Sequence, residues 1–443
     1  MDAALEKPRL AILLKHFGRL ADPRQQWRVA YPMPEVLLLA VCGTISSCDD
    51  YEEIVEWGET HLAFLRRFRP YHHGIPCPDW LRTLMNRIDP ALFQACFTAW
   101  VRECWPDCPD LVALDGKTSR RSHDRGRGRA ALHLVSAFAT NERLVLGQEA
   151  VGEGSCEQET IPVLLERLAE TGSLAGAVVT IDAIACNAKI ANDITEAGAD
   201  YVLAVKDNQP SLKAEIDSFF DTTPPEALDT SIDVDKDHGR IETRTVSVTH
   251  QVDWLASNRR HPGEWRFPRL AALIRVEAIV EKAGKITSER RFYIASAPLS
   301  AARAAQAIRG HWRIENALHW VLDVQFKEDL SRLRRGHGPR NMAVLRHFAI
   351  NIVRSAKDSA PSKPAANAPA STPPICNACS IHYAINPDSL PCAAGRGGRR
   401  RPHSAASSSA CAFATRQAAN LNSGILPYGS SCGLVSTLAA AST

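Results

Sequence analysis

The stretch Leu111-Val112-Ala113-Leu114-Asp115-Gly116-Lys117 places a short apolar run directly before an acidic residue and a glycine. Four consecutive apolar residues that end at Asp and Gly are typical of a short buried strand. A carboxylate at the end of such a strand is costly unless a partner compensates its charge. The segment therefore predicts a short buried strand at 111–114 and makes Asp115 a candidate for a chemical role.

Regular elements extend from this strand toward the C-terminus. Three strands are followed by a helix–strand–helix–strand alternation, which predicts a mixed α/β sheet. Residues 207–298 are predicted to be rich in β-structure because segments such as 243–249 alternate with period two. A long helix is expected from Ala301 to about Val324. The elements expected between these regions are strands at 132–138, 144–148, 177–182 and 201–206, and helices at 157–169 and 188–197.

Four regions differ in composition and pattern. Residues 1–105 have helical spacing, with Asp89 as a predicted N-cap before Pro90, and form a small all-α domain. Residues 106–206 and 299–355 form the α/β core, interrupted by the β-rich insertion at 207–298. The tail at 356–443 is rich in Ala, Ser and Pro, and we expect it to be disordered because it has little apolar surface to bury. Its abrupt start also suggests a frameshifted reading frame.

Composition is typical of an ordinary globular protein, and the sequence also indicates in which cellular compartment the protein is found. The 443 residues are 45% hydrophobic and 23% charged, and the 13 cysteines are an odd number that argues against a disulfide scaffold. No apolar run is long enough to span a membrane, and the N-terminus has no apolar signal core, so we expect a cytoplasmic protein. The net charge of +3 comes from the tail. Binding to nucleic acid would therefore depend on local basic patches.

Three acidic residues occupy positions suited to a metal. Asp115 and Asp182 each close a predicted strand of the same α/β unit, and Glu315 lies on the long helix. Carboxylate oxygens are the ligands that Mg²⁺ prefers, and two such ions support phosphodiester chemistry. The alternative for each acid is a helix cap, a turn residue or half of an ion pair.

Six blocks of sequence follow one another in a characteristic order. They are 114–117 (LDGK), 132–138 (LHLVSAF), 180–183 (TIDA), 201–209 (YVLAVKDNQ), 238–244 (HGRIETR) and 311–320 (HWRIENALHW). In this order they resemble the DDE-type transposases of bacterial insertion sequences, in the branch of the H-repeat-associated proteins. The resemblance covers roughly residues 10–355.

The resemblance implies a fold, a reaction and partners. It implies a ribonuclease-H-like core in which Asp115, Asp182 and Glu315 are the catalytic residues and bind two Mg²⁺ ions, with Mn²⁺ as a substitute. The implied reaction is DNA cleavage at terminal inverted repeats and 3′-OH strand transfer into target DNA. Double-stranded DNA is the implied partner, and a homodimer is expected because two transposon ends must be processed together.

Basic and polar residues around the acids are candidate DNA contacts. In the broader group an arginine precedes the glutamate by four residues and a lysine follows it by seven, but here these positions hold His311 and Leu322. Phosphate contacts would make binding depend on salt, although a charge run is often only a solvated face. His319, an isolated histidine, is expected to be structural. The candidate DNA contacts are Lys117, Arg120, Arg121, Lys206, Asn208, His238, Arg240, His311, Arg313, Arg332, Arg334 and Arg335.

Two other functions remain open at this stage. A catalytically silent DNA-binding protein derived from a transposase would account for the unusual tail. A ribonuclease-H-like junction nuclease would cut branched DNA without sequence preference or strand transfer. Three acids in the expected blocks favour the transposase over the first alternative.

Overall fold

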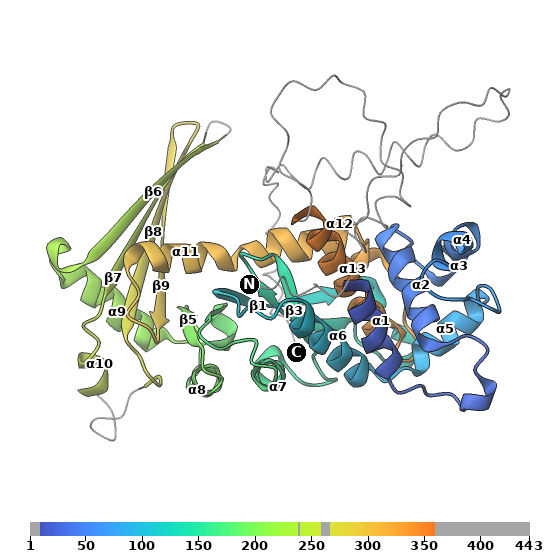
Figure 1. Cartoon of the computed structure of the whole chain (residues 1–443). Coiled ribbons are helices and arrows are strands. Elements are labelled where there is room, and N and C mark those ends of the chain that lie inside the picture. Colours follow the sequence, from blue (N-terminus) through green and yellow to red (C-terminus); the bar gives the residue numbers. More distant parts are fainter. Residues whose placement is uncertain (1–8, 238–239, 258–265, 359–443) are drawn as a thin grey trace, which may run out of the picture.

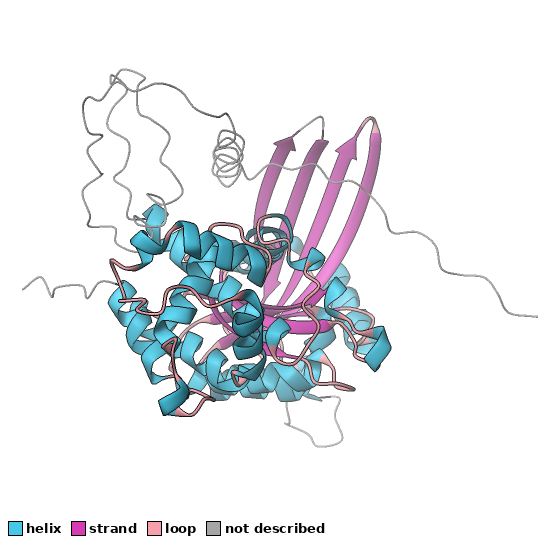
Figure 2. Cartoon of the chain, turned by 90° about the vertical axis from the view of Figure 1, so that its right-hand side faces the viewer, coloured by secondary structure: helices cyan, strands magenta, loops and turns pink. Residues whose placement is uncertain are grey.

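The computed structural model describes residues 9–237, 240–257 and 266–358. The predicted disordered tail beyond 358 and the candidate contact His238 lie outside these residues. Within them, the nine strands form one mixed sheet in the order β3-β2-β1-β4-β5-β9-β8-β7-β6. Helices cover both faces of its first half (Figures 1 and 2). In the described part of the chain no helix is long and apolar enough to span a membrane.

The first five strands form the predicted ribonuclease-H-like core. The antiparallel strands β1, β2 and β3 are followed by β4 and β5, which run parallel to β1 and to each other. Two helices, α7 and α8, connect the later strands. This arrangement confirms the predicted mixed α/β sheet. The bounds are β1 Leu111–Ser119, β2 Leu132–Ala139, β3 Leu144–Ala150, α7 Glu157–Glu170, β4 Val178–Ile181, α8 Ala188–Glu196 and β5 Asp200–Val205.

Strand β1 is longer than the sequence pattern suggested. The apolar run ends at Leu114, but β1 continues to Ser119 because it stays paired with β2, whereas its parallel partner β4 ends at Ile181. Leu114 and Ile181 are paired, so Asp115 and Asp182 each follow the last shared position of β1 and β4. The register therefore brings two acids from distant parts of the chain to the same edge.

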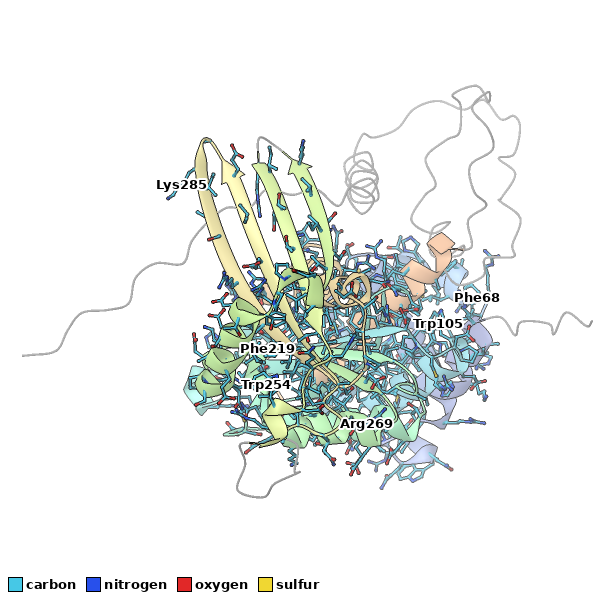
Figure 3. All side chains as sticks on the ribbon, turned by 90° about the vertical axis from the view of Figure 1, so that its left-hand side faces the viewer. Phe68, Trp105, Phe219, Trp254, Arg269 and Lys285 are labelled. Carbon is cyan, nitrogen blue, oxygen red and sulfur yellow. The ribbon has the colours of Figure 1, made fainter. Side chains whose placement is uncertain are left out.

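The β-rich insertion extends the core sheet. Strand β9 pairs antiparallel with β5, and β8, β7 and β6 follow as a meander. Lys285 lies at the tip of the β8–β9 hairpin, which projects beyond the helices, and Phe219 stacks on Trp254 near its base (Figure 3). The region also contains helices that β-patterning did not predict. The bounds are α9 Pro210–Thr222, β6 Asp229–Asp237, β7 Arg240–Thr249, α10 Trp254–Ser257, β8 Ala272–Lys282 and β9 Lys285–Ala295.

The N-terminal helices and the last helix, α13 (Gly338–Asp358), share one hydrophobic core with the sheet. Phe348 of α13 contacts the rings of Phe17, Phe93 and Trp100. Asp89 accepts hydrogen bonds from two backbone amides at the start of α6, which confirms its predicted capping role. The bounds are α1 Arg9–Arg19, α2 Met33–Ile45, α3 Tyr51–Thr60, α4 Leu62–Leu65, α5 Pro78–Arg87 and α6 Pro90–Cys104.

The long helix predicted from Ala301 is divided into three parts. Helix α11 (Ala301–His311) packs on the sheet, and the π-helical segment η6 (Ile314–His319) and α12 (Trp320–Val324) follow it (Figure 1). A Cβ atom on Gly310 would lie 2.2 Å from Leu111, so the glycine permits close packing of α11 on β1. Short π-helical segments within helices often occur at functional sites. Here that segment contains Glu315.

Candidate active site

Asp115, Glu315 and His319 lie together between strand β1 and segment η6. Nδ1 of His319 is 3.6 Å from Oδ2 of Asp115 and 3.5 Å from Oε2 of Glu315. In the described parts of the chain, one ligand atom from each of the three residues lies within 4.8 Å of the other two. The two carboxylates and the imidazole thus form a compact donor set of a kind that could bind a cation.

The electrostatics of this group favour a bound positive charge. Burial raises the pKa of Asp115 to about 7; the imidazole of His319 opposes this rise, and the charge of Glu315 adds to it. The contact with His319 is the main cause that lowers the pKa of Glu315. Two acids at one site disfavour simultaneous ionisation, and a divalent cation reverses that preference. The donor set therefore fits the divalent metal that the family resemblance implies.

Asp182 lies at the end of β4, next to this group, and has other partners. Its Oδ1 accepts hydrogen bonds from the backbone amide of Ala183 at 2.6 Å and from Nζ of Lys206 at 2.8 Å. Burial raises the pKa of Asp182, but the hydrogen bond from Lys206 and the amide outweigh it, and the net pKa is lowered. Asp182 is therefore ionised and is held by Lys206.

His311 connects the two parts of the site electrostatically. Its Nδ1 lies 3.1 Å from Oγ1 of Thr180 on β4. Burial lowers the pKa of His311, and the nearby charges of Asp182 and Glu315 partly oppose this effect. The imidazole of His311 therefore lies within the field of both acids, in the position where the broader group carries an arginine.

Lys117, a candidate phosphate contact, is buried among carboxylates. Its Nζ lies 2.6 Å from Asp323, 3.5 Å from Glu328 and 3.4 Å from Asp329. Burial lowers the pKa of Lys117, but the three carboxylates outweigh burial and raise it overall. Arg346 of α13 also pairs with Glu328, and both side chains are buried. A phosphate contact would require Lys117 to leave these partners.

Arginines from two segments, one after β1 and one before α13, lie side by side. Nε of Arg334 donates to the carbonyl oxygen of Arg121 at 3.1 Å, and Nη1 of Arg129 donates to that of Arg334 at 3.2 Å. Arg120 is 81% exposed while it pairs with Asp329. Arg332 and Arg335 are exposed as well. We call the surface formed by Arg120, Arg121, Arg129, Arg332, Arg334 and Arg335 the basic surface.

The remaining candidate contacts have varied settings. Asn208 donates from Nδ2 to the carbonyl oxygen of Ala183 at 2.5 Å, so it supports the turn that follows Asp182. Arg313 bonds to Oδ1 of Asn141 at 3.0 Å, beyond strand β2. Arg240, at the distal end of β7, pairs with Glu242 on the same strand. These three side chains do not join the basic surface through any described hydrogen bond.

Comparison with known proteins identifies the family of this chain. The family model described as "Transposase DDE domain" matches residues 106–352, and "DDE_Tnp_1-associated" matches residues 14–101. The chain belongs to the DDE transposase family. This transposase is 38% identical to the "H repeat-associated putative transposase YhhI" of Escherichia coli (strain K12), over 78% of this chain and 91% of that protein.

A second relative and one solved structure extend the comparison. The transposase is 34% identical to the "Putative transposase YncI" of Escherichia coli O157:H7, over 78% of this chain and 88% of that protein. A solved structure of the piggyBac transposase synaptic complex with hairpin DNA aligns with a TM-score of 0.40 and 9% identity. That alignment covers 87% of this chain and 81% of the other.

Sequence reasoning did not assign His319 to the site of this transposase. It was expected to be structural, yet it lies between Asp115 and Glu315. Its spacing from Glu315 was informative, because side chains four residues apart share one face of a helix. The ion pair of Lys117 with Asp323 could not be predicted from the spacing of residues in the sequence, because the tertiary fold brings these residues together.

Proposed function

We propose that this transposase cuts DNA at the terminal inverted repeats of its element and joins the freed 3′-OH ends to target DNA. The observation that carries the proposal is the convergence of Asp115 and Glu315 around one imidazole, with Asp182 on the neighbouring strand end. Three carboxylates at adjoining positions suit the binding of two divalent ions, Mg²⁺ or Mn²⁺. In this proposal Asp115, Asp182 and Glu315 are the catalytic residues.

In this proposal each residue of the site has a separate role in the reaction. Asp115 and Glu315 would hold one cation, and Asp182 would hold a second with Asp115 after exchanging its contact with Lys206. When bound, such ions activate the attacking hydroxyl and stabilise charge on the leaving oxygen. Lys206, released from Asp182, would then be free to contact a phosphate next to the scissile bond. His311 would help to hold β4 and the glutamate helix in register through Thr180.

The basic surface is the proposed track for the DNA backbone. Its arginines come from the segment after β1 and the segment before α13, and the hydrogen bonds between these segments present them together. Arginine is suited to bidentate contacts with phosphate, and such contacts position DNA without reading its sequence. We further propose that the protein acts as a homodimer on two paired ends, and that it works in the cytoplasm on nucleoid DNA.

The decisive experiment is cleavage of a labelled linear DNA that carries the element's own end, with Mg²⁺ or Mn²⁺. The full-length wild type should cut at the end, whereas Asp182→Asn should bind the DNA without cutting it. Asp79→Asn is a matched control, because Asp79 lies on α5 and its side chain is 89% exposed. Cutting by Asp182→Asn at the wild-type rate would refute the proposed catalytic triad.

The same assay separates the two other functions. Binding of the end without cleavage by the wild type would favour a catalytically silent DNA-binding protein. Equal cutting of a four-way junction and of the inverted-repeat end would favour a junction nuclease. Strand transfer is followed by adding an unlabelled plasmid and detecting labelled products joined to it.

A further inference from the structure

We propose that His319 is itself a metal ligand, through Nδ1, of the cation that Asp115 and Glu315 hold. The inference rests on the proposed function, which assigns the metal to the three acids alone. His319 has only 5% of its surface exposed, and its Nδ1 faces both carboxylates. Its Nε2 has no hydrogen-bond partner among the described residues. A cation bound between the three side chains would explain why the buried imidazole faces two carboxylates.

The distances around Nδ1 suit a ligand better than a hydrogen-bond donor. Nitrogen–oxygen hydrogen bonds to carboxylates are about 2.7–2.9 Å long. The two distances from Nδ1, 3.6 Å to Asp115 and 3.5 Å to Glu315, are both longer and nearly equal. The three donor atoms therefore surround a common space, and neither distance from Nδ1 is that of a short hydrogen bond.

The alternative is that His319 is a protonated counter-ion of the two acids. A charged imidazolium has an N–H donor at each ring nitrogen, and both need partners when the ring is buried. Nε2 of His319 lacks a partner among the described residues, and its hydrogen is unsatisfied both in the charged ring and in the neutral ring that presents the lone pair of Nδ1. The neutral ring avoids only the cost of burying the positive charge itself.

The backbone holds the imidazole in this direction. Ile314, Leu318 and Leu322 are buried on the helical stretch that carries His319, and they anchor it against the core. Glu315, by contrast, keeps 54% of its side chain exposed. The segment thus combines a fixed nitrogen donor with a carboxylate that can adjust to an ion.

A nitrogen ligand changes which metal the site prefers. Mg²⁺ favours oxygen ligands and keeps much of its water, whereas Mn²⁺ and Co²⁺ accept imidazole more readily. The proposal therefore predicts a site that binds Mn²⁺ more tightly than Mg²⁺ because of His319. Removing the imidazole should weaken Mn²⁺ binding more than Mg²⁺ binding, whereas a purely structural role would weaken both alike.

Pulsed electron paramagnetic resonance of Mn²⁺ bound to the full-length protein tests the inference without an activity readout. We expect the wild type to show a ¹⁴N coupling from a directly bound imidazole, and His319→Gln to lose it. His319→Gln should also weaken Mn²⁺ binding by about 10- to 100-fold, the range typical for groups that support a metal. Mg²⁺ affinity, measured by competition, should fall by a smaller factor.

Two further variants distinguish a failure of the proposed metal site from a failure of the proposed role of His319. His73→Gln removes an exposed imidazole on the N-terminal side of α5 and should leave the coupling intact. Asp115→Asn should abolish Mn²⁺ binding, and retention of wild-type binding there would overturn the proposed metal site and this inference together. Loss of binding in Asp115→Asn with an unchanged coupling in His319→Gln would overturn this inference alone. A wild-type spectrum of bound Mn²⁺ without ¹⁴N coupling would do the same, whatever the folding of the variants.

Discussion

Nζ of Lys117 lies 2.6 Å from Oδ1 of Asp323, and this ion pair joins strand β1 to helix α12. Asp115 precedes Lys117 by two residues on β1, so both side chains point to the same face of the sheet. Asp323 follows the segment that carries Glu315. The pair therefore fixes the strand that carries Asp115 relative to the helical stretch that carries Glu315.

We predict that Lys117→Met lowers the free energy of unfolding by about 3 kcal/mol. The substitution keeps the length of the side chain but removes a buried cation from three carboxylates, and breaking such a network leaves charge uncompensated. Glu328 is the most affected, since its side chain is 3% exposed and Arg346 would be its remaining ion-pair partner among the described residues. Urea unfolding of the full-length chain gives the value.

A matched lysine on the surface provides the control for this prediction. Lys327 pairs with Asp49 at 2.6 Å, and 47% of its side chain is exposed. Exposed pairs of this kind contribute no more than about 1 kcal/mol. Lys327→Met should therefore cost far less than Lys117→Met, and equal losses would contradict a structural role for the buried network.

The sequence was sufficient to predict the core strands and the position of two acids. The apolar runs before Asp115 and Asp182 are local features, and parallel strands of one α/β unit end at the same edge. The extension of β1 to Ser119 was not predictable in this way, because it depends on pairing with β2. The π-helical segment and the burial of Lys117 likewise depend on packing between distant parts of the chain.

Gly116→Ala should destabilise the protein by about 1 kcal/mol, the low end of the cost of overpacking, because the atoms it meets are the ends of two side chains that can turn away. A Cβ atom there would lie 2.1 Å from Oε1 of Glu157 and 2.8 Å from Nε2 of His133. These two side chains contact each other at 2.6 Å directly across the glycine. Thermal unfolding measures the loss, and DNA cleavage should fall with it because Asp115 is the adjacent residue.

A double substitution tests whether this clash is the cause. Glu157→Ala removes the atom nearest to the added methyl group, so Gly116→Ala combined with Glu157→Ala should recover part of the lost stability. Gly126→Ala is a control for the steric effect, because among the described residues its Cβ would meet Oδ1 of Asp124 alone, at an ordinary 3.5 Å. A penalty at Gly126 as large as that at Gly116 would argue against the steric explanation.

On the basic surface, Arg332→Ala and Arg335→Ala should weaken DNA binding and reduce its dependence on salt. Each neutralised phosphate contributes about one unit to the slope of log affinity against log salt concentration, so each substitution should lower the slope by about 1. Binding to unrelated sequences should fall equally, because phosphate contacts do not read bases. Fluorescence anisotropy across a salt series measures both quantities.

Lysine substitutions at the same two positions distinguish the effect of charge from the effect of side-chain shape. Arg332→Lys and Arg335→Lys keep the positive charge and should retain the wild-type slope. An unchanged slope in the alanine variants would place the DNA elsewhere on the transposase. The basic surface would then be a solvent-exposed surface without a role in DNA binding.

Asn351 of α13 forms hydrogen bonds with backbone groups on the outer edge of the sheet. Replacing it should lower the free energy of unfolding by about 2–4 kcal/mol. Strand β3 is the first strand of the sheet, so its outward backbone groups have no strand partner. The amide of Asn351 accepts from the N–H of Val145 at 2.9 Å and donates to its carbonyl oxygen at 2.8 Å. Asn351→Leu would leave both groups buried and unsatisfied.

Asn351→Asp separates hydrogen bonding from packing at the same position. The aspartate has nearly the same volume and can accept from the N–H of Val145, but it presents an oxygen to the carbonyl where the amide donated. If the two hydrogen bonds matter, both substitutions should lower the free energy of unfolding, and hydrogen exchange of the Val145 amide should accelerate most in Asn351→Leu. Because Asn351 is fully buried, the aspartate also carries a cost of charge burial, so exchange of the Val145 amide is the deciding measurement. If Asn351 contributed only its shape, that exchange would not accelerate more than exchange elsewhere in β3. The first result would show that α13 stabilises the edge of the sheet through these two hydrogen bonds.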